Sequence, residues 1–172
     1  MSERLNLGCG EDYRQGWTNL DAVDAVEPDI VHDLNEYPWP FDDGKFIHIE
    51  ARHVLEHLNE PVLALREIAR ILQDNGSVRW VFPIGHTRFE DPTHQHYWTW
   101  NTPAMLAGRR KHPHEVSVPL DVIDQRATWA LSSRDPLTRA YVGAKKWLDG
   151  PGSWLSQVPG LSGEVEVLFE HE

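Results

Sequence analysis

Cysteine is almost absent from this sequence, which contains only Cys9. One cysteine cannot form an internal disulfide or build a thiolate zinc site. It stands between two glycines, so we expect it to pack rather than to react. Long hydrophobic runs are also missing, since no stretch approaches the roughly 18 consecutive apolar residues of a membrane span. The opening residues, MSERLNL, contain no apolar signal region. These absences predict a cytoplasmic protein that does not bind a membrane.

Positive charge is scarce as well. The chain has 16 Lys and Arg residues against 27 Asp and Glu residues, which gives a net charge of −11. Because such a surface repels a phosphate backbone, nucleic acid is not expected as the main partner. The 172 residues, 40% of them apolar, suit one globular domain. Histidine is abundant, and eight of the ten histidines lie between His48 and His114.

Short apolar stretches alternate with connecting segments. Strands are expected at residues 4–7, 18–20, 29–31, 46–51, 77–82 and 164–169. A helix is expected between a cap at Asn59 and a stop at Asn75–Gly76, with Pro83 ending the strand that follows. Residues 135–148 read as a further helix, and residues 150–163 as a loop. This alternation predicts an α/β fold with a mostly parallel sheet, in which ligands bind at the carboxyl ends of the strands.

A glycine loop follows the first strand. Gly8 and Gly10 allow a tight turn whose free N–H groups can bind an anion. The third glycine and the distant acid of a dinucleotide fingerprint are missing, which disfavours a nicotinamide cofactor. Asp21 ends the second strand, where its carboxylate can accept both hydroxyls of a ribose. Asp33 ends the third, where it can meet an adenine edge. The alternative for both acids is that they cap turns.

The motifs LNLGCG, NLD, DIVHDL, YPWPFDDGKFIHIEARHVLEHL, LREIARILQDNGSVRWVFP and DPTHQHYWTWNTPAML occur in this order. Together, over residues 4–107, they resemble the class I S-adenosylmethionine-dependent methyltransferases, and among them a compact, type 11-like branch. The resemblance implies a Rossmann-like fold with an antiparallel last strand, and S-adenosylmethionine as the cofactor. It implies one domain over residues 1–172, with a cofactor-binding core at 1–107 and a substrate-side segment plus the final strand at 108–172.

The resemblance also assigns residues to the cofactor. The loop around Gly8 holds the methionine end, Asp21 the ribose, and Asp33 with Leu34 the adenine, while His53 lies near the sulfonium. The full set of implied cofactor residues is Leu7, Gly8, Cys9, Gly10, Asp21, Asp33, Leu34, Arg52 and His53.

The link between the loop and the second strand is unusually short. Residues 11–17 can supply at most about two helical turns, where a crossover helix is usual. The pocket on this side is therefore either open, or covered by Tyr13, by Trp17 or by the second subunit of a homodimer.

The histidines suggest acid–base chemistry. In HVLEH, His53 and His57 lie four apart and would share a helix face. Glu56 is in the wrong place for a zinc-protease motif, and no full ligand set appears at helical spacing. No metal is therefore predicted, and a metallohydrolase is disfavoured. Three roles stay open for His57: acid–base catalysis or substrate positioning, a structural role, or a metal ligand.

A second histidine-rich segment starts at Asp91. Its histidines, His94 and His96, either face the substrate or belong to a covering loop, whereas Trp98 and Trp100 are expected to pack on the core. The candidate catalytic residues are thus His57, His94, His96 and Asp91, with Asp91 or Glu56 orienting the ring of the base. A basic cluster, Arg109, Arg110 and Lys111, is either a solvated loop or a site for an anionic substrate.

The sequence predicts methyl transfer from S-adenosylmethionine to an oxygen or nitrogen of a small molecule or glycan. The alternative is a non-catalytic cofactor-binding or interaction module with the same fold.

Overall fold

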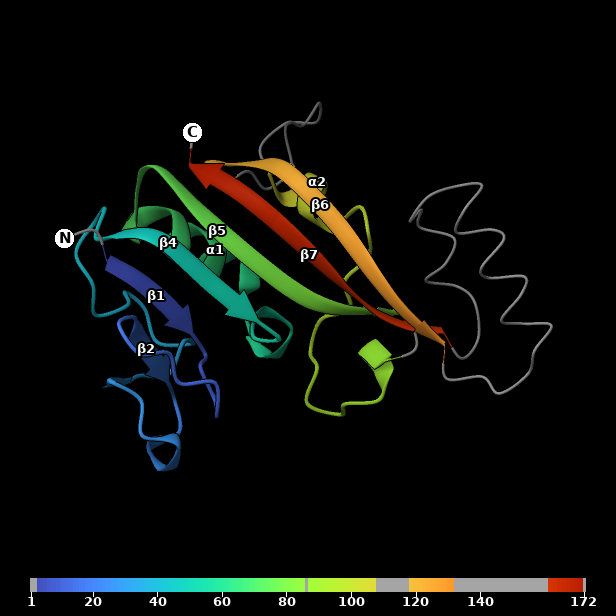
Figure 1. The fold of residues 1–172 in the computed structure, drawn as a ribbon, viewed down its shortest axis with the longest axis horizontal. Helices are drawn as coiled ribbons and strands as arrows, with labels where there is room; N and C mark the ends of the chain where they lie inside the picture. Colours follow the sequence, from blue (N-terminus) through green and yellow to red (C-terminus); the bar gives the residue numbers. More distant parts are fainter. Residues whose placement is uncertain (1–2, 86, 108–117, 132–160, 172) are drawn as a thin grey trace.

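The computed structural model describes residues 3–85, 87–107, 118–131 and 161–171. Seven strands form one sheet in the order β3-β2-β1-β4-β5-β7-β6 (Figure 1). All neighbours pair in parallel except β7, which is antiparallel to both β5 and β6. The strands are β1 (Glu3–Leu7), β2 (Thr18–Asp21), β3 (Ile30–Val31), β4 (Phe46–Arg52), β5 (Leu72–Gly85), β6 (Leu120–Leu131) and β7 (Leu161–His171). The predicted Rossmann-like sheet with an antiparallel last strand is confirmed.

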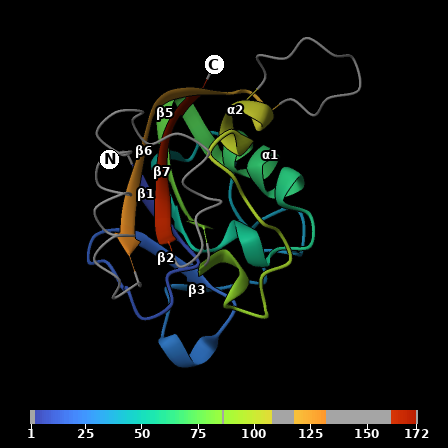
Figure 2. The same cartoon turned by 90° about the vertical axis from the view of Figure 1, so that its right-hand side faces the viewer.

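Both α-helices of the described residues, α1 (Pro61–Ile71) and α2 (Thr102–Leu106), lie on the same side of the sheet (Figure 2). Short 3-10 turns occur at η1 (Asp24–Val26), η2 (Leu55–His57) and η3 (Thr87–Phe89). Helix α1 turns an apolar stripe toward the sheet because its buried residues recur at helical spacing. They are Pro61, Ala64, Leu65, Ile68, Ala69 and Ile71. The core therefore forms between this stripe and one face of the sheet.

The ends of α1 differ from the prediction. Asn59 does not cap the helix. Its backbone amide donates to Asn35 Oδ1 over 2.8 Å, and Glu60 takes the cap position without a side-chain hydrogen bond. The helix ends at Ile71 rather than at Asn75–Gly76, because Leu72 already pairs with Phe46 in the sheet. Sheet pairing thus overrides the local stop signal.

Strand β5 is also longer than expected. Pro83 does not end it, because pairing with β7 continues through Pro83 and Glu164 to Gly85 and Ser162. Strand β6 was not predicted at all, although it pairs with β7 over most of its length. The helix expected at 135–148 and most of the loop expected at 150–163 lie outside the described residues, but residues 161–163 belong to β7.

The connection between β1 and β2 contains no helix over residues 11–17, which agrees with the predicted limit of about two helical turns. Two buried asparagines hold it instead. Asn19 accepts the Arg14 amide over 2.9 Å and donates to the Arg14 carbonyl over 3.0 Å, while Asn6 donates to Asn19 Oδ1 over 3.1 Å. Side-chain amides therefore satisfy backbone groups that a helix would have satisfied internally.

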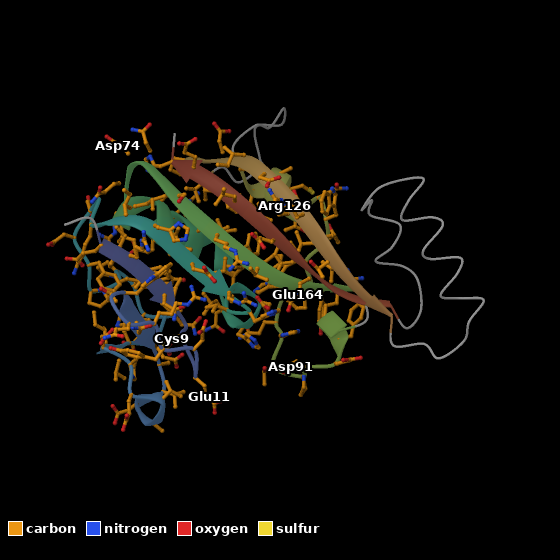
Figure 3. The ribbon with its side chains drawn as sticks, viewed as in Figure 1. Cys9, Glu11, Asp74, Asp91, Arg126 and Glu164 are labelled. Atoms are coloured by element: carbon orange, nitrogen blue, oxygen red, sulfur yellow. The ribbon has the colours of Figure 1, made fainter. Side chains whose placement is uncertain are left out.

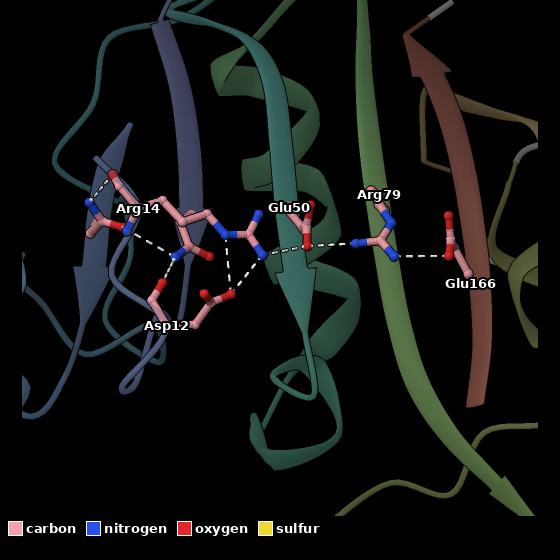
Figure 4. Close-up of polar contacts among 7 residues, drawn as sticks. Asp12, Arg14, Glu50, Arg79 and Glu166 are labelled. Carbon is pink, nitrogen blue, oxygen red and sulfur yellow. Dashed lines mark hydrogen bonds and ion pairs between the residues drawn. The ribbon is translucent and has the colours of Figure 1, made fainter. Parts of the chain in front are cut away.

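The face of the sheet opposite α1 carries a row of charges (Figure 4). Glu50 Oε1 accepts from Arg14 over 2.8 Å and from Arg79 over 2.7 Å, and Arg79 also reaches Glu166 over 2.9 Å. Burial raises the pKa of Glu50, but the two guanidinium groups outweigh it and leave this pKa below its usual value. Ion pairs thus occupy a face on which no described helix packs.

Within the described residues, no helix has both the length and the apolar character needed to cross a membrane.

Candidate functional site

A cavity of about 370 Å³ opens at the carboxyl ends of the parallel strands. It lies in the size range of small-molecule sites. Five residues assigned to the cofactor line it: Gly8, Asp21, Asp33, Leu34 and His53. His57, a candidate catalytic residue, lines the same cavity. The carboxyl ends of β1, β2, β3 and β4 thus bring these predicted residues together.

Further lining residues were missed, namely Ala22, Val23, Asn35, Val54 and Leu58. Each follows a predicted site residue within a few positions, so nearness in the sequence to those residues could have identified them. Most of them are apolar, which suits the faces of a purine ring.

The glycine loop is shaped by one close approach. Gly8 has a φ of +62°, and a Cβ placed there would lie 2.5 Å from Val54 Cγ2. The backbone therefore reaches the cavity only because Gly8 lacks a side chain. The amides of Cys9 and Gly10 are not free, since they donate to the Leu20 carbonyl over 3.0 Å and to Asp21 Oδ2 over 2.8 Å. The expectation of free N–H groups is wrong for these two residues.

Both acids also cap turns. Asp21 Oδ1 accepts the Val23 amide over 2.9 Å, and Asp33 Oδ1 accepts the Asn35 amide over 2.9 Å. A carboxylate oxygen can accept more than one hydrogen bond. The two proposed roles are therefore compatible, because each carboxylate lines the cavity and keeps acceptor capacity.

His53 does not share a helix with His57. Its φ is +51°, in the left-handed region that favours glycine, and η2 begins only at Leu55. The ring contacts two carboxylates, with Nε2 at 2.9 Å from Glu164 Oε1 and Nδ1 at 3.4 Å from Glu56 Oε1. Glu56 chiefly raises the pKa of His53, burial opposes this, and Glu164 adds to the rise. Strand β7 thus supplies a site contact that the sequence did not reveal.

His57 is held by a short relay. Its Nδ1 lies 3.0 Å from Thr93 Oγ1, and the Thr93 hydroxyl donates to Asp91 Oδ1 over 2.6 Å. The rings of His57 and His94 lie against each other with centroids 4.7 Å apart. Asp91 therefore orients His57 through Thr93, a residue absent from the predicted set. Thr93 thus links the two candidate catalytic residues His57 and Asp91 through its hydroxyl group.

The remaining predictions for this segment concern two tryptophans and His96. Trp98 is buried and packs edge-on against Trp80 with ring centroids 5.4 Å apart, and Trp100 packs at the border of the core. Both expectations are confirmed. His96 stacks on Trp98 at 5.4 Å, and its Nε2 lies 3.4 Å from the Asn59 carbonyl oxygen. His96 therefore has partners away from the ring of His57.

Four residues assigned to the cofactor do not line this cavity. Leu7 is buried in the core, and Cys9 is buried beneath the loop, where burial raises the pKa of its thiol. Gly10 contributes through Asp21, and Arg52 is exposed. The basic cluster at 109–111 lies outside the described residues.

Two further features bear on ligand binding. Glu56, His57 and His94 each offer a ligand atom within 4.8 Å of the others, although His94 comes from a different segment. A larger hollow of about 600 Å³, which Asp74 helps to line, lies where β5 begins. Because β1, β4 and β5 run in parallel, the start of β5 and the end of β1 lie at opposite edges of the sheet. The hollow is therefore remote from the glycine loop, as the positions of Asp74 and Cys9 in Figure 3 illustrate.

Known proteins share this domain and fold. Residues 12–79 match a family model described as a methyltransferase domain. The crystal structure of MccD protein superposes with a TM-score of 0.62 at 13% identity, covering 100% of this chain and 90% of that one. A SAM-dependent methyltransferase from Archaeoglobus fulgidus gives 0.62 at 12% identity, covering 98% and 86%.

An S-adenosylmethionine-dependent methyltransferase from Mesorhizobium loti gives a TM-score of 0.56 at 12% identity, covering 98% of this chain and 90% of that one. No curated protein matches the sequence. A methyltransferase domain model thus matches part of the chain, and the solved structures show that the chain shares their fold.

Proposed function

We infer that the protein transfers the methyl group of S-adenosylmethionine to an oxygen or nitrogen atom of a small molecule or glycan. One observation carries this proposal. The groups suited to the cofactor, among them Gly8, Asp21 and Asp33, line the same cavity as the oriented His57. A donor and an acceptor can therefore meet there without a large rearrangement.

The cofactor would enter with its ribose at Asp21, whose carboxylate keeps lone pairs for the two hydroxyls. The adenine would lie near Asp33 and Leu34, and the methionine end near the Gly8 loop. Leu7, Cys9 and Gly10 support that loop from the protein side, and His53 would face the sulfonium. The fit is supported by the apolar residues beside Asp21 and by the close backbone approach that Gly8 permits.

His57 is the best supported group for activating the acceptor. Imidazole is the side chain most often used for proton transfer at neutral pH. The relay from Asp91 through Thr93 fixes the ring, and His94 packs beside it. In the transfer, the acceptor oxygen or nitrogen would form a bond to the methyl carbon as the carbon–sulfur bond breaks, and His57 would take the acceptor proton. S-adenosylhomocysteine is the second product.

A non-catalytic cofactor-binding module remains the second candidate. It is favoured by the loop amides of Cys9 and Gly10, because both donate hydrogen bonds within the protein and so leave fewer donors for the cofactor. Such a module would bind S-adenosylmethionine and never convert it.

Calorimetry with S-adenosylmethionine and S-adenosylhomocysteine tests the first step. The second step is an assay for S-adenosylhomocysteine release across a panel of hydroxylated compounds, amines and oligosaccharides. We expect turnover with one acceptor class, and a loss of about 10²–10⁴ in rate for His57→Ala with nearly unchanged cofactor affinity. Binding without turnover across the panel would favour the module, and no binding of either nucleoside would end the proposal.

A further inference from the structure

Glu56 carries a buried carboxylate that has no hydrogen-bond partner among the described residues. The residue is fully buried, with 0% of its surface exposed, and neither carboxylate oxygen accepts a hydrogen bond. His53 Nδ1 lies 3.4 Å from Oε1, which is longer than a well-formed hydrogen bond. Burying a carboxylate without compensation is costly, so a ligand that brings positive charge and N–H donors would stabilise this group.

Two imidazole rings lie beside this carboxylate. One ring nitrogen of His57, one of His94 and one oxygen of Glu56 all lie within 4.8 Å of one another. Glu56 and His57 come from η2, and His94 comes from the segment that follows η3. The backbone joins the two segments, because the amides of Gln95 and His96 donate to the Glu56 carbonyl over 2.8 and 3.1 Å. The fold itself therefore holds the three side chains together.

The hydrogen bonds of both histidines fix their tautomers. His94 Nδ1 lies 2.9 Å from the Arg88 carbonyl oxygen, which can only accept, so Nδ1 carries the proton. Thr93 donates its hydroxyl proton to Asp91, so Thr93 Oγ1 accepts from His57 Nδ1. His94 Nε2 lies 4.0 Å from Asp91 Oδ2, which is beyond hydrogen-bond reach. Each neutral ring therefore offers the lone pair of Nε2 as an acceptor.

Three acceptors at this spacing suit a primary ammonium group. Such a group has three N–H donors in a tetrahedral arrangement. With hydrogen bonds of about 2.8 Å, three acceptors around one nitrogen lie roughly 4.6 Å apart, which falls within the 4.8 Å limit of the cluster. The positive charge also compensates the carboxylate of Glu56. A hydroxyl group has one donor and no charge, so it would leave two of the three acceptors unpaired.

We propose that Glu56, His57 and His94 bind the ammonium group of a primary amine, and that this amine is the methyl acceptor. His57 also lines the cofactor cavity, so the bound nitrogen lies beside that cavity. Small rotations of the two imidazole rings admit the ligand to the buried carboxylate. The net charge of −11 on the chain favours the approach of a cation.

This amine site deepens the proposed methyl transfer and rests on it for its purpose. An alkylammonium, whose pKa is about 10.4 in a lysine side chain, is protonated at neutral pH and has no lone pair. His57 Nε2 takes one proton from it, which leaves a neutral amine held by Glu56 and His94. The nitrogen lone pair then forms the bond to the methyl carbon as the carbon–sulfur bond breaks. S-adenosylhomocysteine and the methylated ammonium leave, and the proton passes from His57 to solvent.

Chemical-shift titration of the isotope-labelled full chain tests the site. The probes are n-butylamine, 1-butanol and butyltrimethylammonium, each titrated with and without S-adenosylhomocysteine. We expect saturable shifts with n-butylamine. Binding should be at least about 10-fold weaker for 1-butanol, which lacks the charge, and for butyltrimethylammonium, which lacks N–H donors. If either of these two probes binds as tightly as n-butylamine, the proposal is wrong.

Variants of the cluster show where the amine binds. Glu56→Gln keeps the shape of the side chain and removes its charge, so it should weaken n-butylamine binding by about 10- to 150-fold. His94→Ala removes one neutral acceptor and should weaken binding by about 2- to 10-fold. Glu60→Gln is the matched control, because it removes a negative charge at an exposed position four residues away, and it should bind the amine like the wild type. Equal affinities for the wild type and Glu56→Gln would overturn the proposal.

Thermal melting separates a binding defect from a folding defect. Without ligand, Glu56→Gln should melt at the same temperature as the wild type or higher, because it removes an uncompensated buried charge. Saturating n-butylamine should raise the melting temperature of the wild type and not that of Glu56→Gln. A lower melting temperature for ligand-free Glu56→Gln would indicate that the carboxylate already has a partner within the protein, which contradicts the proposal.

The panel of methyl acceptors separates this site from the proposed methyl transfer. Turnover of primary amines, with none for compounds that offer only hydroxyl groups, supports both proposals. Turnover confined to hydroxyl compounds contradicts the amine site and leaves methyl transfer intact. Amine binding that is lost in Glu56→Gln, in a chain that does not bind S-adenosylmethionine, supports the ammonium-binding cluster and contradicts methyl transfer.

Discussion

The backbone amide of Gly10 donates to Asp21 Oδ2 over 2.8 Å, so the glycine loop and the acid at the end of β2 are directly joined. The other oxygen of Asp21 accepts the Val23 amide over 2.9 Å. Asp21 therefore fixes the loop before any ligand arrives, and its carboxylate, which lines the cavity, keeps lone pairs for a ligand. Preorganisation of this kind reduces the entropy lost on binding.

Replacing Asp21 tests this arrangement. Asp21→Ala should weaken S-adenosylmethionine binding by about 10- to 150-fold, because charge-assisted hydrogen bonds contribute about 1.5–3 kcal/mol. It should also lower the free energy of unfolding by about 1 kcal/mol, since two backbone amides lose their acceptor. Calorimetry and urea unfolding measure the two effects. Asp21→Asn, which keeps an acceptor oxygen but loses the charge, should fall between the wild type and the alanine variant. Unchanged affinity in folded Asp21→Ala would remove the residue from the site.

The two loop glycines should respond differently to alanine. Both have positive φ, so each substitution places a side chain in the left-handed region, at a cost of about 1–2 kcal/mol. At Gly8 the new Cβ also meets Val54 Cγ2 at 2.5 Å, whereas at Gly10 nothing lies within 4 Å. Overpacking should add about 1–3 kcal/mol for Gly8→Ala.

Urea unfolding of the two variants measures this difference. The double variant Gly8→Ala with Val54→Ala is the control, because it removes both Cγ atoms and should recover part of the added loss relative to Val54→Ala alone. Equal losses for Gly8→Ala and Gly10→Ala would show that the approach to Val54 does not constrain the loop.

The charge row of Figure 4 predicts unequal costs for its two acids. Glu50 has only 6% of its side chain exposed and pairs with both Arg14 and Arg79, whereas Glu166 is 45% exposed. Glu50→Ala leaves two guanidinium groups without their shared acceptor and should lower the free energy of unfolding by about 2–3 kcal/mol. This lies below the cost of breaking a fully buried pair because both arginines reach solvent. Glu166→Ala should cost less than about 1 kcal/mol. Similar losses, or a Glu50 effect abolished by 1 M salt, would contradict this assignment.

Glu67 should make stability depend on acid pH. Its carboxylate accepts from Arg70 over 2.7 and 2.9 Å and from the Trp39 amide over 2.8 Å. The bonds from Arg70 chiefly lower the pKa of Glu67. Because the folded-state pKa lies below the unfolded value of about 4.3, this stabilisation is full above that value and is lost as the pH falls through the folded-state pKa.

The stability difference between the wild type and Glu67→Gln should therefore shrink between pH 6 and pH 3 in urea unfolding. Glu11→Gln, at an exposed acid on the loop between β1 and β2 (Figure 3), provides the comparison and should differ little from the wild type at either pH. A difference for Glu67→Gln that stays constant or grows toward pH 3 would contradict the role given to Arg70.

The sequence predicted those strands whose apolar residues are regular and whose ends carry polar groups. It missed β6 for two physical reasons. This edge strand carries charges such as Asp121, Asp124 and Arg126, which protect an edge from further pairing. A register shift between Val122 and Asp124 also breaks the period of two on which strand prediction depends. The end of α1 was predicted wrongly because Leu72 pairs with Phe46 of β4, and no local sequence pattern indicates this pairing.

The site was predictable where it follows strand ends. Asp21 ends β2, Asp33 lies two residues past β3 and His53 directly follows β4, so parallel topology alone gathers them. The acceptor side depends instead on contacts between distant segments. His57 and His94 meet across 37 positions, and Thr93 matters only because its hydroxyl lies between His57 and Asp91. Helical spacing could not reveal that these residues meet, since His57 lies in η2 whereas Asp91, Thr93 and His94 come from the segment after η3.

The short link between β1 and β2 has a consequence for the order of folding. Leu5 pairs with Thr18, only 13 positions away, whereas Ser77 in β5 pairs with Glu170 in β7, 93 positions away. Chain closure costs free energy that grows with the logarithm of the loop, so the near pair forms about 1.7 kcal/mol more cheaply. A crossover helix would have lengthened that loop. We therefore expect β1 and β2, with their buried asparagines, to dock early, and the antiparallel end of the sheet to close in a later, slower step.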